Sequence, residues 1–187
     1  MWLFFLYIAY MRTTLFTIIS ILCVYTFAGA QTTWHQQSYE ISFKIKNTGL
    51  SVNGTLGNLK TTLVFSPDHI STSSLKGSVD VGTINTGINA RNTHLKKPEY
   101  FNVDTFKVIQ ISSIKLYVKG AQYAGLFDVT IKGVTKQIEI PFEFNQFADE
   151  AEFKASFPLN RRDFGVGGKS MLMADELTVN IDVKAKK

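Results

Sequence analysis

Basic and polar side chains gather in residues 83–101, whose sequence is TINTGINARNTHLKKPEYF. In this stretch Arg91 and His94 are candidates for contacting the head group of a ligand, because a guanidinium group donates paired hydrogen bonds to phosphate or carboxylate. For His94 the alternative is structural, a hydrogen bond that fixes the end of a helix. Apolar residues flank the stretch, which predicts that it forms the mouth or lid of an apolar container.

A second basic stretch, residues 160–168, reads NRRDFGVGG and lies between two expected strands. Its glycines permit positive φ and close approach of the backbone. Arg161 and Arg162 add two fork-shaped donors, so they are further head-group candidates. In the alternative, the loop is structural and Asp163 pairs with one of these arginines, as in many ion pairs that do little for stability.

No pattern of catalytic or metal-binding residues occurs in the sequence. His35, His69 and His94 are widely separated, and there is neither a nucleophile elbow nor a paired-carboxylate motif. We therefore expect no catalytic residue, no metal ligand and no cofactor, in a protein that is not an enzyme. The formal charge of +5 is spread along the chain and does not call for a nucleic-acid partner.

Residues 1–30 are predicted to be a cleaved signal peptide. Arg12 supplies a basic residue, an apolar run that contains the only cysteine follows, and the small residues at 28–30 fit a cleavage site. The stretch before Met11 lacks a positive charge, so Met11 is the expected true start. An uncleaved membrane anchor is the alternative. Cleavage leaves residues 31–187 as the mature domain, which we expect to be periplasmic or secreted.

Apolar and polar residues alternate along almost the whole mature chain, which predicts strands. Residues 137–144 show the pattern best, and Pro141 within them indicates an edge position, a bulge or a bend. Residues 49–58, rich in glycine and asparagine, predict turns instead. The expected strands are residues 39–46, 59–65, 76–84, 106–117, 126–132, 137–144, 151–157 and 177–184.

Seven or eight such strands, each with one polar face, predict an antiparallel all-β fold. The pattern fits a sandwich or a closed barrel equally well. The polar stretch around Arg91 is the one expected helix, with Asn89 as its N-cap, Leu95 as its inward anchor and Pro98 barring its continuation. A helix this short must pack on the β body to be stable.

Three blocks of the sequence together resemble the YceI-like family. The blocks are NTG, RNTHL and YFNV within residues 85–103, GLFDVTIKGVTK at 125–136, and NRRDFGVG at 160–167. They occur in the family's order, and the resemblance spans roughly residues 39–183. It implies an extended antiparallel lipocalin-like β-barrel of about eight strands with one short helix, which binds a polyisoprenoid-like lipid and is often periplasmic.

Three features depart from the family's pattern, one of which is the absence, around residues 105–107, of a proline that is common after the helix block. Asn92 stands where the family has an aspartate beside Arg91, and the NTG sequence at 47–49 replaces a His-x-Gly motif. These departures concern the polar end of the site more than the fold, and they leave the identity of the lipid open.

The resemblance and the leader imply an exported protein that carries or sequesters a long-chain isoprenoid or a similar amphiphile. The candidate cavity residues are Phe43, Phe65, Phe127, Phe142, Phe144, Phe153 and Phe157. Transient contact with a membrane surface is compatible with such a ligand, and the oligomeric state stays open, a homodimer included. The alternative function is an exported structural or partner-binding β-domain with a filled core and no ligand.

Overall fold

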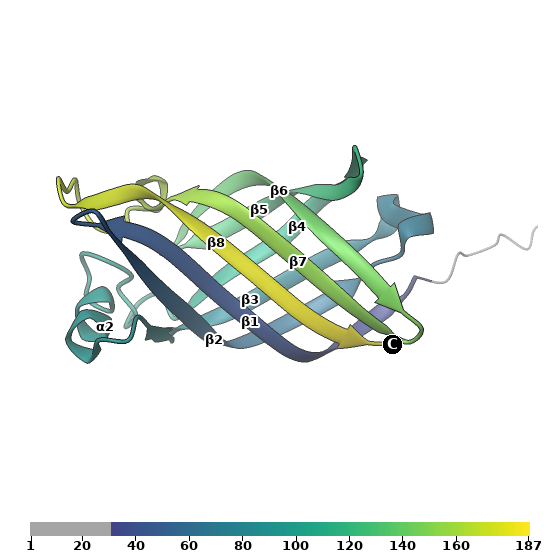
Figure 1. Ribbon diagram of the computed structural model, residues 1–187, viewed down its shortest axis with the longest axis horizontal. Coiled ribbons are helices and arrows are strands. Elements are labelled where there is room, and N and C mark those ends of the chain that lie inside the picture. The colour runs from purple at the N-terminus through teal and green to yellow at the C-terminus, as the bar shows by residue number, and fades with distance from the viewer. Residues whose placement is uncertain (1–30) are drawn as a thin grey trace, which may run out of the picture. The chain divides into compact units, whose positions relative to one another are not determined.

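Residues 31–187 form a closed β-barrel in the computed structural model, which describes this part of the chain; the predicted signal peptide and the alternative start at Met11 lie outside it. Each strand pairs antiparallel with the next, and β8 pairs with β1 to close the barrel (Figure 1). The strands are β1 (Thr33–Asn47), β2 (Leu50–Val64), β3 (Ser74–Asn85), β4 (Val108–Lys119), β5 (Gln122–Ile131), β6 (Val134–Phe147), β7 (Glu150–Asn160) and β8 (Met173–Lys186).

The all-β prediction is confirmed, and of the two architectures that the sequence allowed the barrel is the correct one. Closure follows from the register of β1 against β8, in which Phe43 lies opposite Val179 and Ile45 lies opposite Leu177. These four side chains are the apolar members of their alternating strands and face the interior. An eight-stranded barrel has an interior that side chains fill or that holds one small ligand.

The segment 49–58 was expected to be a turn, and this was wrong, because β2 begins at Leu50 and runs through it. Gly54 pairs with Phe43 of β1, and a Cβ atom at Gly54 would lie 2.3 Å from Cζ of the Phe43 ring. The glycine therefore makes room for an aromatic ring across the strand pair, a role in which glycine occurs within strands. The true turn is Thr48-Gly49, whose φ values of 52° and 79° fit a two-residue hairpin.

Pro141 lies at a local edge of β6, as predicted. Its strand pairs with β5 along residues 134–142, but the ladder to β7 begins only at Phe142, opposite Ala155. At Pro141 the missing backbone N–H therefore breaks no bond to β7.

The short helix η2 (Arg161–Phe164) follows β7 and contacts β6.

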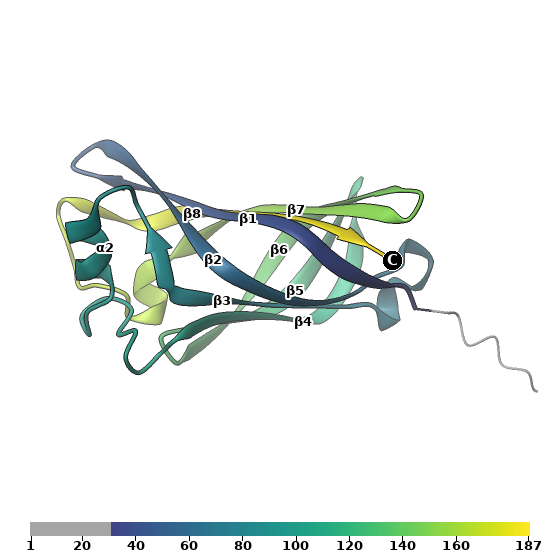
Figure 2. The same ribbon diagram turned by 90° about the horizontal axis from the view of Figure 1, so that it is seen from below.

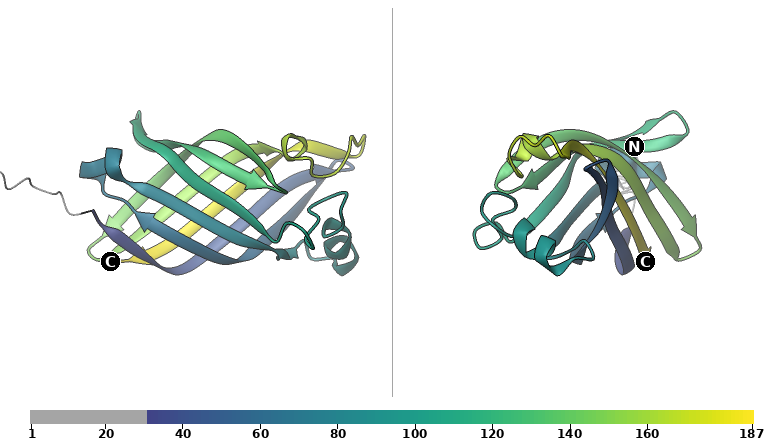
Figure 3. Two further views of the ribbon diagram at one scale, coloured as in Figure 1. Left: turned by 180° about the vertical axis from the view of Figure 1, so that it is seen from behind. Right: turned by 60° about the vertical axis from the view of Figure 1, so that its left-hand side comes forward.

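The two ends of the barrel differ. One end carries α2 (Asn89–Leu95), the β1–β2 hairpin and the loop before β8, and we call it the α2 end (Figure 2). The other end carries the 3-10 helix η1 (Pro67–Thr72), the β6–β7 hairpin and the C-terminus, as the view from behind also shows (Figure 3). No helix within residues 31–187 is long and apolar enough to cross a membrane.

Candidate ligand-binding cavity

A cavity of about 270 Å³ lies inside the barrel, and its wall is almost entirely apolar. Small-molecule pockets usually measure about 300–1,000 Å³, so this volume stands at the lower edge of that range. The wall is mostly aliphatic and draws on every strand. Its isoleucine, leucine and valine members are Ile41, Ile45, Val52, Leu56, Leu59, Leu63, Leu75, Val79, Ile84, Leu95, Ile109, Ile111, Val129, Ile131, Ile140, Leu159, Val166, Leu177, Val179, Ile181 and Val183.

Five of the seven predicted phenylalanines lie on this wall. They are Phe43, Phe127, Phe142, Phe153 and Phe157. The remaining two, Phe65 and Phe144, lie beyond the cavity, where they pack with other rings. Phe65 is fully buried, so it contributes to the core rather than to a surface that a ligand touches.

The two outlying phenylalanines belong to an aromatic cluster near the barrel end opposite α2, which we call the aromatic plug. Its members are Trp34, Phe65, Tyr123, Phe142, Phe144 and Phe153. Ring centroids lie 4.7 Å apart for Phe65 and Phe144 and 4.9 Å apart for Phe144 and Phe153. Trp34 donates its indole N–H to the carbonyl oxygen of Phe65 at 2.9 Å. The plug therefore fills one end of the barrel with packed rings and leaves the cavity toward the α2 end.

Helix α2 is tied to the end of β3 by Thr86. The hydroxyl of Thr86 donates to Oδ1 of Asn92 at 2.7 Å and accepts from Nε of Arg91 at 2.8 Å. Asn92 Oδ1 also accepts a hydrogen bond from the backbone N–H of Thr86. Arg91 Nη2 donates to the carbonyl oxygen of Thr86. Asn92, at the position where the family has aspartate, thus serves as a neutral acceptor that holds the helix in place.

The expected N-cap role of Asn89 was wrong. The N-cap is Ile88, which offers no side-chain acceptor, and Asn89 is the first helical residue. The anchor is Asn92 instead, one turn further on, so the short helix depends on side-chain bonds to β3. Leu95 contacts the cavity, in agreement with its predicted inward role.

Arg91 is half-buried at the cavity wall and has no carboxylate within ion-pair distance among residues 31–187. Its bonds to Thr86 use Nε and one proton of Nη2, which leaves Nη1 and the second Nη2 proton without a partner among the residues that the structure describes. The guanidinium therefore brings to a largely apolar wall a positive charge that no carboxylate of residues 31–187 pairs with.

Arg161 also touches the cavity, but its charge is paired and four of its five N–H donors are satisfied. Its Nε donates to Ala174, its Nη1 to Val166 and Gly168, and its Nη2 to the carboxylate of Asp175 at 2.7 Å. Only 4% of the residue is exposed. The structural alternative for this loop is thus the better description, with Asp175 of β8 as the partner rather than Asp163.

Arg162 and His94 lie away from the cavity wall. Arg162 is exposed and reaches Asp175 at 3.4 Å. The exposed ring of His94 packs edge-on against Tyr100, with centroids 4.9 Å apart. Tyr100 lines the cavity, so His94 supports a wall residue without contacting the interior.

Three features of the site did not follow from the sequence reasoning. Asp175 lies 14 residues from Arg161, and only the register of β8 against β7 brings the two together. Phe164 of η2 is buried and lines the cavity through a loop that the strand pattern does not cover. The aliphatic wall was visible as alternating residues in the strands, but the same alternation is expected of a filled core.

Comparison with known proteins assigns the family. The model of the YceI-like domain matches residues 33–185. The chain belongs to the YceI-like family. A UPF0312 protein of Photorhabdus laumondii is 24% identical over 131 residues, which are 66% of this chain and 68% of that protein. A UPF0312 protein of Staphylococcus aureus is 26% identical over 168 residues, which are 86% of this chain and 92% of the relative.

Two solved structures share the fold. BcnA of Burkholderia cenocepacia is similar with a TM-score of 0.76 at 20% identity, covering 79% of this chain and 96% of BcnA. A polyisoprenoid binding domain from Saccharophagus degradans is similar with a TM-score of 0.64 at 12% identity, covering 82% and 97%. At these identities the likeness establishes the β-barrel fold alone, and it agrees with the expected lipocalin-like architecture.

Proposed function

We propose that this YceI-like protein binds a long-chain amphiphile of the isoprenoid type, with the apolar chain inside the barrel and the polar end at α2. The observation that carries the proposal is the apolar cavity, which the packing of an ordinary β core does not require. The polyisoprenoid binding described for the Saccharophagus degradans domain supports the same ligand class. Export behind the predicted leader and a role as carrier are parts of this proposal.

The apolar wall supplies a large part of the free energy of binding. Each CH₂ group moved from water into an apolar site contributes about 0.8 kcal/mol. Ten such groups contribute about 8 kcal/mol, against which stand several kcal/mol for lost motion and ordering. Ten buried CH₂ groups alone therefore fall short of the roughly 8.2 kcal/mol net that a micromolar Kd requires, so further apolar contact or a bond to the polar end must supply the rest. A filled β-domain offers no such burial.

The polar end of the ligand is the second part of the proposal. Arg91 is the cavity arginine whose charge is not matched by a carboxylate in the described part of the chain. A phosphate or carboxylate placed there accepts charge-assisted hydrogen bonds from Nη1 and Nη2. Arg161 is already neutralised by Asp175, so of the four head-group candidates that the sequence offered we keep Arg91.

Extraction of the purified mature protein tests the ligand class. We expect organic extraction and mass spectrometry to yield a long-chain lipid at close to one molecule per protein. Protein freed of lipid should take up a fluorescent polyisoprenoid or fatty-acid analogue. Reproducibly empty protein that takes up no analogue would refute the proposal and leave the structural β-domain as the function.

Substitution of Arg91 tests the head-group assignment. Arg91→Gln should weaken the binding of an anionic amphiphile about tenfold or more, because a hydrogen bond to a charged group contributes about 1.5–3 kcal/mol. A neutral amphiphile of the same chain length should bind nearly as before. Lys97→Gln is the matched control, since it removes a charge from the exposed face of the same end without touching the cavity. Equal losses for both amphiphiles would show that Arg91 only supports α2.

A further inference from the structure

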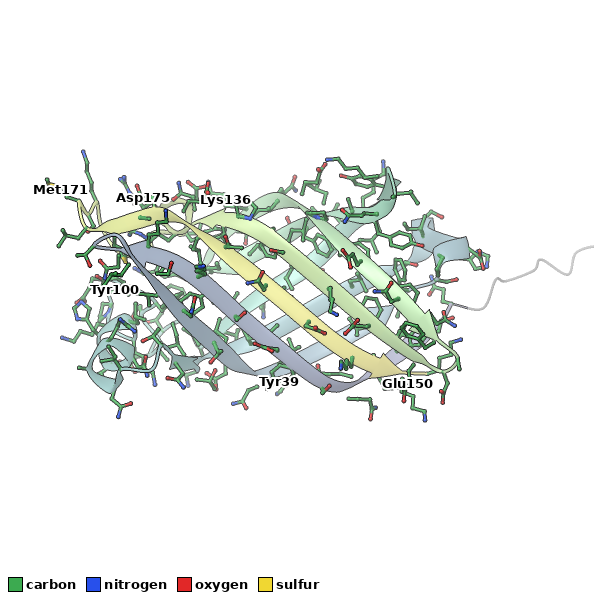
Figure 4. All side chains as sticks on the ribbon, in the orientation of Figure 1. Tyr39, Tyr100, Lys136, Glu150, Met171 and Asp175 are labelled. Atoms are coloured by element: carbon green, nitrogen blue, oxygen red, sulfur yellow. The ribbon has the colours of Figure 1, made fainter. Side chains whose placement is uncertain are left out.

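Three large apolar side chains are exposed together at the α2 end. Leu50 is 72% exposed, Met171 is 99% exposed and Leu172 is 64% exposed. We call these three residues the apolar tip. Leu50 follows the β1–β2 turn, and the other two lie in the loop before β8. Figure 4 labels Met171 at the outermost point of that loop.

The two loops of the apolar tip are joined to each other. The backbone N–H of Thr48 donates to the carbonyl oxygen of Leu172 at 2.6 Å, and Asn47 pairs with Met173. The exposed side chains therefore belong to one local structure rather than to scattered surface positions. Singly exposed apolar residues need no explanation, but a group on adjoining loops indicates a contact surface.

The charges within the two segments that carry the apolar tip have one sign, and the nearest acidic residue after the second segment, Asp175, is paired with Arg161 and Arg162. Residues 41–67, which include the β1–β2 hairpin, contain no aspartate or glutamate, and neither do residues 164–174 of the other loop. Lys44, Lys46 and Lys169 are exposed on these same segments. Exposed apolar side chains with lysines on either side complement a surface whose outer layer is anionic and whose interior is apolar.

The cavity extends to this same end. Asn47 and Met173, the residues that directly flank the turn and the loop of the apolar tip, both line it. A bilayer in contact with the apolar tip would therefore lie next to the cavity end that the aromatic plug leaves unfilled.

We propose that the apolar tip docks on the surface of an anionic phospholipid bilayer, with Leu50, Met171 and Leu172 inserted at the boundary of head groups and acyl chains. The lysines contact the lipid phosphates. The purpose of the docking, which is exchange of the amphiphile between membrane and barrel, rests on the proposed function. The physical basis of the docking itself is the exposed apolar group and its charge.

Vesicle binding tests the docking. The full mature protein is mixed with vesicles of phosphatidylcholine and of phosphatidylcholine with phosphatidylglycerol, and bound protein is measured by flotation. We expect the doubly substituted variant Met171→Glu/Leu172→Glu to lose at least about tenfold in partitioning, since two apolar side chains no longer enter the membrane. Lys46→Gln and Lys169→Gln should each lose about fivefold on the anionic vesicles only, and added salt should remove that difference.

Phe147→Glu is the matched control. Phe147 is 70% exposed in the β6–β7 hairpin, where it pairs with Glu150, at the end of the barrel opposite Met171 (Figure 4). This variant should bind vesicles as the unsubstituted protein does. Equal loss in Phe147→Glu, or undiminished binding of the Met171/Leu172 variant, would overturn the docking proposal. So would an absence of vesicle binding by the unsubstituted protein, which would point to a protein partner.

The docking and the ligand proposals fail in different ways. Near-ultraviolet circular dichroism should show that the Met171/Leu172 variant is folded, and it should still take up a lipid analogue added from ethanol. Vesicle binding without uptake would leave the docking standing and refute the ligand. Uptake of the lipid analogue, with vesicle binding unchanged by substitution of the apolar tip, would leave the ligand proposal standing and refute the docking.

Discussion

Arg91, Arg161 and Arg162 share a side chain and differ in what surrounds the guanidinium group. Arg162 is exposed to solvent. Arg161 is buried and donates four hydrogen bonds, one of them to Asp175. Arg91 is half-buried and has no carboxylate partner in the described residues. A solvated arginine contributes little, and a buried paired arginine holds structure together. A partly buried and unmatched arginine is the one suited to receive an anion from outside.

Removal of Arg161 should destabilise the protein. Arg161→Met keeps most of the volume but leaves Oδ1 of Asp175 and the carbonyl oxygens of the loop without the donors that Arg161 supplies. We expect the free energy of unfolding to fall by about 2–4 kcal/mol, measured by urea denaturation. Arg162→Met is the control and should change it by less than about 0.5 kcal/mol. Similar values for the two variants would contradict the assigned role.

At the scale of elements, the β1–β2 pair shows how strands of unequal side-chain size fit together. The ring of Phe43 lies over the backbone of Gly54, which gives an aromatic residue a place on a strand pair that also bounds the cavity. Glycine weakens an isolated strand, but here it is the complement of its cross-strand partner.

Gly54→Ala should be costly only while Phe43 is present. The added Cβ atom would lie 2.3 Å from the ring, so the ring or the strand must move. We expect a loss of about 1–3 kcal/mol in the free energy of unfolding, as for overpacking of a core. In a Phe43→Leu background the same substitution should cost clearly less, and a double-mutant cycle with chemical denaturation measures the difference. Additive losses would show that the two residues do not interact.

Strands in which apolar and polar residues alternate regularly were predictable from the sequence. Strands whose composition is explained only by packing against a neighbouring strand were not. The alternation in β6 and the meaning of Pro141 needed only local rules. The start of β2 was hidden because its glycines and asparagines have the composition of a turn, and only the ring of Phe43 across the pair explains Gly54. In the same way, Asp175 becomes the partner of Arg161 through register, which a sequence without structure does not contain.

For the whole molecule, alternation settles that the interior is apolar but not whether it is full. That depends on the summed volumes of side chains from eight strands, and the balance leaves about 270 Å³ at the α2 end and a dense aromatic plug at the other. The family resemblance predicted the barrel and the ligand class. Which of the predicted arginines lacks a carboxylate partner in the described residues became clear only from the contacts of Arg91.

Filling the cavity should abolish uptake of the ligand. Val179 of β8 lies on the wall opposite Phe43 in register, so Val179→Trp places an indole ring in the free volume. We expect at least about a tenfold loss of bound lipid analogue in a fluorescence titration, with a modest change in stability. Thr178→Trp adds the same ring to the next residue, which is exposed, and should bind as the unsubstituted protein does. Uptake by Val179→Trp at the original level would place the ligand elsewhere.

The aromatic plug fills the end of the barrel opposite α2, so for an amphiphile bound as we propose the cavity is a blind tunnel. A chain that enters tail first cannot thread through, so it must withdraw by the route it took, with its polar end leading. Two chains cannot pass each other in such a tunnel, and an incoming molecule has to wait until the occupant has gone. Replacement should then proceed at the dissociation rate of the first ligand, however much of the second is supplied.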